Sequence, residues 1–586
     1  MLTMHELISG STQVAALAAP YSGLKATNMP SGGMSFLVNC LAYPNGTAYN
    51  EELVSPPYTT GRLYDSIYVR HWDTWLTQQR YALFAGSLTS SDGGYSLDGD
   101  VRNLLTGIEA PVTRPETPVQ PFGGTDNYDL SPDGSQAVFL TKAPELSKAN
   151  YTASYYYLVP VDGSAVATQL NGPGTSAPEE AQGASGAAVW SPDGQYIAYY
   201  QQDGISYESD RSKLYVAEVA SGSITPVAED WDSSVGTIRW SNDCNNLWIA
   251  SDYWGSTRLF VVPTDAGADY KPENITDITS VVDYYVLPDD RVLVTASAVW
   301  SSANFYTVTA DADTNVLYRA NEHDANLAGL GPQDLEYIWY TGTLGDQQQA
   351  IVVYPTDFDP NQVYDLVFYV HGGPQGFTGN TWSNRWNLKT WADQGYVIFG
   401  PNPTGSTSYG QALTDRIQGK WGGWPYEDLV LAHTWACENL AFVNCSNAVG
   451  AGASYGSYMM NWIQGHDLGR EFKALVSHDG VATTIAEYGT EELWFINHDF
   501  NGTLWDSRPV YEEWDPMRFA KNFATPEFII HNDLDFRLPV SEGLMMFNAL
   551  QAQGVPSRFL NFPDEGHWVL DRENSLYWHN EIFNWM

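Results

Sequence analysis

Short apolar strands and polar turns alternate through the first half of the chain. A degenerate repeat, in which a turn precedes a strand, appears as L-S-P-D-G-S-Q-A-V-F-L from Leu130 and as W-S-P-D-G-Q-Y-I-A-Y-Y from Trp190. Later copies start at Trp240 and Leu287, and a fainter copy starts at Met29. Measured at the proline, or at the asparagine that replaces it, the last four copies lie 60, 50 and 46 residues apart. Several strands in a period of this size predict a β-propeller and disfavour a pair of β-sandwiches.

The pattern changes after about residue 335, where apolar strands alternate with amphipathic helices. Strand-like runs end at Val370 and begin at Tyr396, Ala474 and Glu527, and a helical pattern covers residues 426–440. This alternation predicts a doubly wound, mostly parallel sheet. Ligands of such sheets bind beyond the carboxyl ends of the strands, so functional residues are expected directly after each run.

The run Gly452-Ala453-Ser454-Tyr455-Gly456 is a G-x-S-x-G motif. The strand-like A-V-G-A precedes the motif, and the helix-compatible Y-M-M-N-W-I-Q-G follows it. Strand, tight turn and helix in that order are what a nucleophile elbow requires, because the turn strains the serine and leaves room only for small neighbours. The alternative is a serine that caps a helix in a glycine-rich turn. The flanking elements favour an α/β-hydrolase domain with Ser454 as its nucleophile.

Such a serine needs an acid and a base later in the chain, in the order Ser, Asp, His. The strand E-F-I-I-H leads into an acidic turn with two candidates, Asp533 and Asp535. His567 follows the strand-like F-L-N-F on a loop, 113 residues after the serine. His579 is the only other histidine beyond Asp535, and it falls in the predicted final helix. We therefore predict His567 as the base.

Acyl transfer also needs N–H donors for the oxyanion of the tetrahedral intermediate. The residue after the nucleophile, Tyr455, supplies one donor. The turn His371-Gly372-Gly373-Pro374 follows a strand and is predicted to supply the second, since its glycines let the backbone approach the substrate. An ordinary tight turn is the alternative.

Composition limits the number of domains and the kinds of partner that the chain can have. The 586 residues are 43% hydrophobic, which predicts packed domains, and their number suggests at least two. We assign residues 1–334 to the propeller and 335–586 to the α/β-hydrolase domain. The net charge of −42 argues against nucleic acid and anionic membranes as partners. The chain lacks H-E-x-x-H, Walker and EF-hand motifs, so no metal ion and no cofactor are expected.

The cysteines and the glycosylation sequons indicate whether the protein is secreted. The four cysteines show no zinc-binding spacing, and Cys437 and Cys445 are close enough in sequence for a disulfide, with four free thiols as the alternative. Together with the strong acidity, five N-x-S/T sequons favour a secreted glycoprotein, although the start M-L-T-M-H-E-L-I-S-G shows no signal peptide. The sequons begin at Asn45, Asn150, Asn274, Asn444 and Asn501.

Long runs of the chain resemble the prolyl oligopeptidase family of serine peptidases, and most closely its secreted fungal dipeptidyl-peptidase V branch. The runs include Y-D-S-I-Y-V-R-H-W-D from Tyr64, H-G-G-P-Q from His371, T-E-E-L-W-F from Thr490 and H-N-D-L-D-F-R-L-P-V from His531. The resemblance implies a β-propeller joined to an α/β-hydrolase domain. It also implies Asp535 as the acid, because the family's acid precedes x-R-x-P, and Gly373 as the second oxyanion donor.

The reaction implied by the resemblance is removal of dipeptides from the N-termini of peptides. A carboxylate near the site would anchor the substrate's ammonium group, and the candidates are Glu51, Glu52 and Glu208. The chain departs from the family pattern in two ways. Ser457 replaces a glycine after the elbow. The match also starts inside the family's N-terminal half, so an incomplete propeller of about five blades is expected. The alternatives are an acylaminoacyl peptidase or esterase with the same triad, and a non-catalytic homologue. The oligomeric state stays open.

Overall fold

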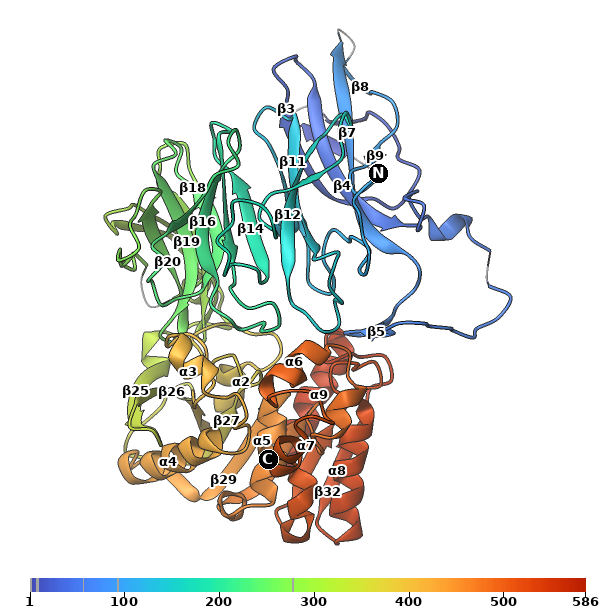
Figure 1. Ribbon diagram of the computed structural model, residues 1–586. Coiled ribbons are helices and arrows are strands. Elements are labelled where there is room, and N and C mark those ends of the chain that lie inside the picture. The colour runs from blue at the N-terminus through green and yellow to red at the C-terminus, as the bar shows by residue number, and fades with distance from the viewer. Residues whose placement is uncertain (1–2, 7–9, 56, 92–93, 277–278) are drawn as a thin grey trace. The chain divides into compact units, whose positions relative to one another are not determined.

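The computed structural model describes residues 3–6, 10–55, 57–91, 94–276 and 279–586 (Figure 1). These residues fall into two compact units. Unit 1 comprises Met1–Val69, Trp75–Ile249 and Val261–Pro272, and unit 2 comprises Arg70–Thr74, Ala250–Phe260 and Glu273–Met586. Unit 2 therefore takes two short segments from the first half of the chain.

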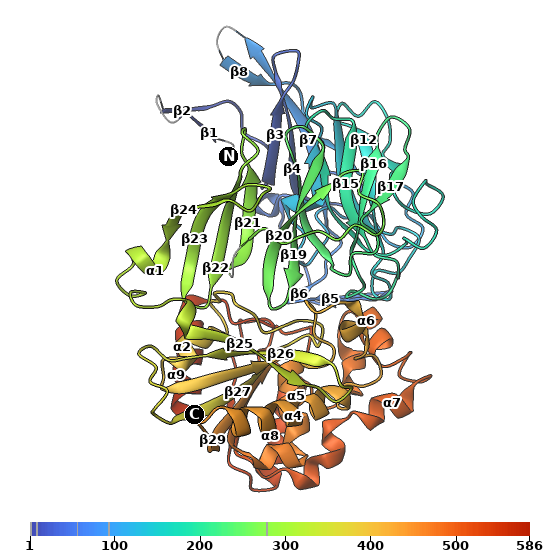
Figure 2. The same ribbon diagram turned by 90° about the vertical axis from the view of Figure 1, so that its left-hand side faces the viewer.

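Four small antiparallel sheets belong to the first half of the chain, and a fifth of the same kind follows in unit 2. Figure 2 shows the strands of the fifth sheet side by side in chain order. The sheets are, in order, β3 (Ser22–Asn28), β4 (Met34–Ala42), β7 (Arg80–Ser91), β8 (Gly94–Leu97) and β9 (Arg102–Asn103); β10 (Tyr128–Leu130), β11 (Gln136–Lys142), β12 (Ser154–Pro160) and β13 (Thr168–Gln169); β14 (Ser185–Trp190), β15 (Tyr196–Gln201), β16 (Lys213–Glu218) and β17 (Ile224–Val227); β18 (Val235–Trp240), β19 (Asn246–Tyr253) and β20 (Ser256–Pro263); and β21 (Ser280–Val286), β22 (Val292–Ala298), β23 (Ser301–Val308) and β24 (Thr314–Arg319).

The predicted repeat is the hairpin between the first and second strands of each sheet. In three copies a serine hydroxyl donates to an aspartate two residues later and accepts the N–H of the residue that starts the second strand, as in Ser131, Asp133 and Gln136. The serine hydroxyl holds the pKa of Asp133 below its ordinary value. Gly134 takes a φ of 73° at the end of the turn, and Cys244 takes 63° at the equivalent place. The shared turn chemistry explains why the repeat was visible in the sequence.

Neighbouring sheets in unit 1 meet through their first strands. β10 contacts β3 and β14, and β14 contacts β18. In a propeller the blades pack side by side around a central axis, so these contacts are those expected of successive blades. The fold prediction of a β-propeller before an α/β-hydrolase domain is confirmed. Two hairpins complete the strands of the first half, β1 (Thr3–Glu6) with β2 (Gly10–Gln13) and β5 (Arg70–His71) with β6 (Thr74–Trp75).

Eight strands form the large sheet of unit 2, in the spatial order β25-β26-β28-β27-β29-β30-β31-β32. The pairs β25–β26 and β26–β28 are antiparallel, and all later pairs are parallel. The strands are β25 (Leu335–Thr341), β26 (Gln347–Val353), β27 (Tyr364–Val370), β28 (Tyr396–Pro401), β29 (Val443–Ala453), β30 (Phe472–His478), β31 (Glu527–Ile530) and β32 (Ser557–Leu560). The helices are α1 (Ala320–His323) beside the fifth small sheet, then α2 (Leu388–Ala392), α3 (Gln411–Asp415), α4 (Trp424–Asn439), α5 (Tyr455–Gln464), α6 (Leu493–Asp499), α7 (Arg508–Glu513), α8 (Val540–Ala552) and α9 (Arg572–Trp585).

The central strand β27 is buried on both faces. Phe368 belongs to a core cluster with Leu429 of α4 and Met459 of α5. Its neighbour Val367 belongs to the opposite cluster, with Trp578 of α9. Helices therefore cover both faces of β27, and the strand is accessible at its ends. This leaves the loops at the carboxyl edge as the place for chemistry.

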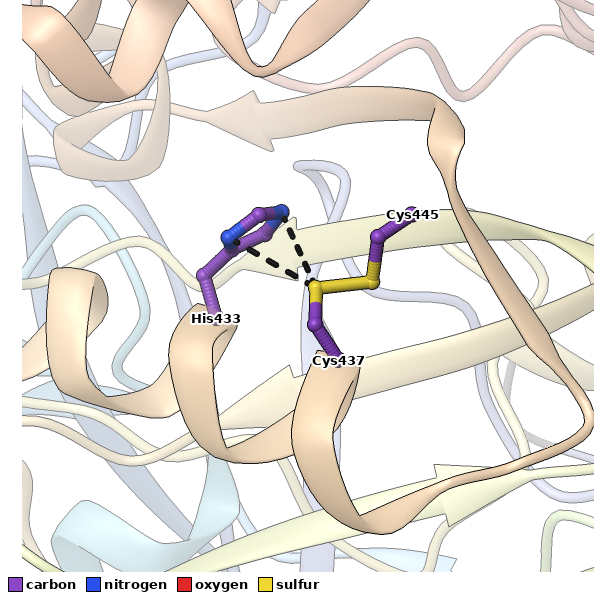
Figure 3. A group of neighbouring side chains, drawn as sticks. All are labelled: His433, Cys437 and Cys445. Atoms are coloured by element: carbon purple, nitrogen blue, oxygen red, sulfur yellow. Dashed lines mark hydrogen bonds between the residues drawn. A yellow bond between two sulfur atoms is a disulfide. The ribbon is translucent and has the colours of Figure 1, made fainter.

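A disulfide joins α4 to β29 and settles the pairing that the sequence left open. The sulfurs of Cys437 and Cys445 lie 2.01 Å apart, while Cys40 and Cys244 are free thiols. Figure 3 shows the imidazole of His433, one turn before Cys437, next to this disulfide, with its Nε2 3.7 Å from the Cys437 Sγ. Among the described residues, no helix combines the length and the apolar character needed to cross a membrane.

Candidate active site

Ser454 stands on the sharp turn between β29 and α5. Its backbone angles are φ 58° and ψ −122°, a region that residues with a side chain rarely occupy. Holding a residue there costs about 1–3 kcal/mol and persists only where the surroundings impose it. The turn projects the residue beyond the carboxyl end of β29 and makes it the residue that precedes α5. This is the strained geometry that a nucleophile elbow predicts.

The two glycines of the motif are required by packing. A Cβ on Gly452 would lie 2.5 Å from the backbone of Gly456. A Cβ on Gly456 would lie 2.1 Å from the carbonyl oxygen of Val370, at the end of β27. The turn is thus tight because α5 starts directly against the neighbouring strand. Ser457, where the resemblance expects glycine, is fully buried, and its Oγ lies 2.5 Å from the Oγ of Ser477.

The turn His371-Gly372-Gly373-Pro374 lies beside the serine because β27 and β29 pair in parallel, with Val370 opposite Gly452. A Cβ on Gly372 would lie 3.2 Å from the Ser454 Cβ and 3.8 Å from its Oγ. Gly373 has a φ of 128°, which only glycine adopts easily. The backbone of this turn therefore approaches the serine as closely as a substrate-binding loop must.

His371 fixes the turn and stays neutral. Its Nδ1 lies 2.7 Å from the carbonyl oxygen of Gly372, and its Nε2 lies 3.0 Å from the hydroxyl of Ser406. Since a carbonyl can only accept, Nδ1 carries the proton and Nε2 accepts from the serine. Burial lowers the pKa of His371 to about 4, so the ring holds this arrangement at neutral pH.

Asp535 and His567 form a buried pair. The His567 Nδ1 lies 2.7 Å from the Asp535 Oδ2, and the Asp535 Oδ1 accepts the backbone N–H of Leu538 at 2.8 Å. Asp535 is 1% exposed and His567 is 8% exposed. An ionised carboxylate only accepts, so Nδ1 of the neutral imidazole carries the proton. The Nε2 of His567 is then left as a proton acceptor.

A second acid, Asp479, lies between the serine turn and this pair, and the sequence did not single it out. It follows β30, and the N–H of Ser454 donates to the preceding carbonyl, that of His478, at 2.9 Å. Both the N–H and the Nδ2 of Asn532 donate to its carboxyl group at 3.2 Å, and the Asn532 Nδ2 also donates to the Gly566 carbonyl at 2.8 Å. Hydrogen bonds therefore link the loops of Ser454, Asp535 and His567 at the carboxyl edge.

The two buried carboxyl groups cannot both be ionised at little cost. Burial, together with the charge of Asp535, raises the pKa of Asp479 well above its ordinary value. This shift favours the protonated form of Asp479, and the carboxyl group that contacts the imidazole is that of Asp535.

The predicted substrate anchors belong to unit 1. Glu51 and Glu52 open a short 3-10 helix, Glu51–Leu53, and are exposed, as is Glu208. Their role stays a prediction. Of the sequons, Asn45, Asn274 and Asn501 are exposed, while Asn150 and Asn444 are partly buried.

Three groups of side chains in the described residues have metal-ligand spacing. They are His433 with Cys437 and Cys445; His71 with Glu491 and Glu492; and Asp479 with Asp535 and His567. The cysteines of the first group form the disulfide, so they offer no thiolate. The third group is the acid–histidine cluster just described.

These elements together define a serine hydrolase of the α/β-hydrolase class. A strained serine follows a central parallel strand, a glycine turn lies beside it, and a buried aspartate–histidine pair follows later strands.

Comparison with known proteins narrows this class. The Prolyl oligopeptidase family matches residues 382–586. Dipeptidyl-peptidase 5 of Aspergillus fumigatus is 51% identical over 581 residues, which is 98% of this chain and 80% of that protein. Dipeptidyl-peptidase 5 of Aspergillus oryzae is 50% identical over 98% of this chain and 80% of its own length. The chain belongs to the prolyl oligopeptidase family of serine peptidases.

Solved structures share the fold at low identity. An acylaminoacyl peptidase of Pyrococcus horikoshii has a TM-score of 0.69 and 17% identity, covering 91% of this chain and 76% of that one. A puromycin-hydrolyzing peptidase of Mycobacterium tuberculosis has a TM-score of 0.59 and 17% identity, covering 96% of this chain and 94% of its own.

Proposed function

We propose that the chain is a serine exopeptidase that releases dipeptides from the N-termini of oligopeptides. Ser454 is the nucleophile, His567 the general base and acid, and Asp535 the carboxylate that holds the imidazole. The N–H groups of Tyr455 and Gly373 bind the oxyanion. The observation that carries this proposal is the strained Ser454 at the edge of the sheet that also holds the 2.7 Å contact between Asp535 and His567.

In the acylation step, the Ser454 hydroxyl attacks the carbonyl carbon of the second substrate residue. The Nε2 of His567 takes the hydroxyl proton, and Asp535 stabilises the resulting imidazolium. His567 then gives this proton to the leaving amine as the peptide bond breaks. Water hydrolyses the acyl-enzyme by the same route in reverse, releasing the dipeptide and restoring the serine.

The two oxyanion donors come from neighbouring strands. As the first residue of α5, Tyr455 has no helical carbonyl four residues before it that could accept its N–H. The glycine turn lies against the same serine through Gly372. Donors fixed in this way stabilise the developing charge by about 3–4 kcal/mol each.

The dipeptide preference comes from similarity. The two Aspergillus relatives, named dipeptidyl-peptidase 5, are about half identical to this chain along nearly all of it. In this proposal residues 1–334 form the propeller, residues 335–586 form the catalytic domain, and Glu51, Glu52 or Glu208 binds the substrate ammonium group. Replacing the anchoring glutamate by glutamine would raise KM for free-amine substrates and leave kcat nearly unchanged.

A panel of 4-nitroanilide substrates tests the specificity. We expect cleavage of dipeptide substrates with a free amino group, and much weaker cleavage of single residues and of N-acetylated dipeptides. The Ser454→Ala variant should lose activity by about 10⁴-fold or more on all of them. Preference for the N-acetylated substrates would instead show an acylaminoacyl peptidase. Equal slow hydrolysis by the wild type and the variant would show a non-catalytic protein.

The proposal includes secretion. The Cys437–Cys445 disulfide and the three exposed sequons, at Asn45, Asn274 and Asn501, support it. Treatment of the secreted protein with an N-glycosidase should lower its mass, and a mass unchanged by the enzyme would contradict glycosylation.

A further inference from the structure

Five residues from the first half of the chain, Arg70–Thr74, belong to unit 2. We call them the clamp segment. The first four of them end the run Y-D-S-I-Y-V-R-H-W-D, which the chemistry described so far does not use. They contact the loops that carry Asp535 and His567, although nearly 500 residues separate His71 from His567 in sequence.

Four contacts anchor the clamp segment in unit 2. The backbone N–H of Trp72 donates to the Glu491 carboxyl group, and the Trp72 carbonyl accepts the N–H of Phe536 at 2.9 Å. His71 Nε2 lies 2.7 Å from the Glu492 Oε1. The Arg70 guanidinium donates to the Gly489 carbonyl at 2.9 Å.

Trp72 is held in a conformation that its side chain disfavours. Its φ is 59°, which is an outlier for a bulky residue. Such strain persists only where neighbouring groups impose it, and here hydrogen bonds on both sides of Trp72 do so. Strained residues of this kind cluster at functional sites.

The strained backbone sets the Trp72 indole against the predicted base. Its ring centroid lies 5.5 Å from that of His567 and 4.8 Å from that of Trp568, edge to face in both cases. The Arg385 guanidinium lies 4.4 Å from the Trp568 ring. A Cβ on Gly566 would lie 3.0 Å from the Cβ of Asp73, so the clamp segment also packs against the residue before the histidine.

The hydrogen bond to Asp535 fixes one edge of the His567 ring. The tilt of the ring about that edge and the position of its loop depend on packing against neighbouring side chains. Asn532, which donates to the Gly566 carbonyl, and Arg385, which lies over the Trp568 ring, also restrain the loop. Trp72 contacts the ring itself, and its carbonyl binds the residue after Asp535. One residue of the clamp segment thereby restrains both members of the aspartate–histidine pair.

From this geometry we propose that Trp72 is a positioning residue for catalysis, which holds the His567 imidazole in line with Ser454. The proposal rests on the catalytic roles given above. The residue acts through His567 and needs no contact with the substrate. Displacing a catalytic base by about 1 Å costs roughly 100-fold in rate, so loss of the indole should be visible in the chemical step.

A small fluorophosphonate separates positioning from substrate binding. The reagent depends on the base that activates Ser454, but it offers few groups for a peptide-binding wall to contact. We expect Trp72→Ala to lower the labelling rate by about 10–100-fold and to lower kcat on a dipeptide 4-nitroanilide by a similar factor. KM should change by less than about threefold, and Trp72→Phe should recover most of both rates.

Two further variants complete the test. Trp505→Ala, at a side chain that is 71% exposed, is the matched control and should keep wild-type rates. If Trp72→Ala does not fold, Trp72→Leu replaces it, because leucine keeps apolar bulk without the flat ring. The labelling rates of Trp72→Leu and Trp72→Phe are then compared, and the proposal requires the leucine variant to be the slower. A Trp72→Ala enzyme with an unchanged labelling rate, or with a raised KM alone, would overturn the proposal. Failure of the wild type to label at Ser454 would instead contradict the proposed function.

Discussion

Replacing Gly456 by alanine tests whether the serine turn and the oxyanion turn are packed together as described. Gly456 is helical and fully buried, and alanine is the better helix former by about 1 kcal/mol. Helix propensity alone therefore predicts a more stable protein. The structure predicts the opposite, because the new methyl group has no space.

The size of the effect follows from the contacts. The alanine Cβ would lie 2.1 Å from the Val370 carbonyl oxygen and 3.0 Å from the His371 carbonyl oxygen. A contact of 2.1 Å must open to at least 3.0 Å, so α5 and the end of β27 must separate by about 0.9 Å. Overpacking of this kind costs about 1–3 kcal/mol of stability. The same movement separates Ser454 from the glycine turn, and a misplacement of about 1 Å costs roughly 100-fold in rate.

The assay is kcat/KM on a free-amine dipeptide 4-nitroanilide, together with thermal unfolding of the same preparations. We expect Gly456→Ala to lower kcat/KM by about 100-fold at a temperature where the variant is still folded. Gly267→Ala is the matched control, since Gly267 is exposed and a Cβ there would lie 3.5 Å from the Asp269 Oδ1, an ordinary contact. A folded Gly456→Ala enzyme with the activity of the control would refute the packing argument.

Three more predictions concern the acid, a buried carboxyl group and the disulfide. Asp535→Asn should lower kcat/KM by about 10⁴-fold in the 4-nitroanilide assay, because an amide no longer fixes the His567 tautomer. Burial raises the pKa of Glu527 from 4.5 to about 7, so the folded state retains a proton that the unfolded chain has lost between these pH values. Stability therefore falls as pH rises through this window, and Glu527→Gln should gain about 3 kcal/mol over the wild type in denaturant melts at pH 8 but little at pH 4. Replacing Cys437 and Cys445 by serine opens a loop with a sequence separation of 8 and should cost about 2.5 kcal/mol in thermal unfolding, whereas Cys244→Ser should change little. A stability difference between the wild type and Glu527→Gln that does not change with pH would contradict the argument from burial of Glu527. Equal melting temperatures of the double cysteine variant and Cys244→Ser would contradict the argument from the disulfide.

The catalytic candidates were readable from the sequence because each follows a recognisable strand. Parallel strands bring their carboxyl ends to one edge, so Ser454 after β29 and the acidic turn after β31 had to lie near each other. The choice between Asp533 and Asp535 depended on the family resemblance. The structure shows that Asp535 contacts His567, while Asp533 accepts a hydrogen bond from Asn561.

The supporting residues could not be found in the same way. Asp479 is one of 69 acidic residues and belongs to no motif, and only the pairing of β30 between β29 and β31 brings it to the site. Trp72 lies in the first half of the chain, and no periodicity relates it to the loop of His567. Its positive φ and its contacts across unit 2 are properties of the folded chain alone.

The fold was predicted from repetition. The serine–aspartate hairpins recur because each small sheet begins with the same turn, and that turn needs the same few side chains. The disulfide stayed open because two cysteines eight residues apart can lie on one element or on two. Here Cys437 lies in the last turn of α4 and Cys445 lies near the start of β29, which brings their sulfurs together.

The most direct test of the central claim is to treat the purified protein with a fluorophosphonate and to map the modified residue by peptide mass spectrometry. We predict a single modified residue, Ser454, with labelling lost in Ser454→Ala and strongly slowed in His567→Ala. Modification of a different residue, or labelling of Ser454 at an undiminished rate without His567, would contradict it.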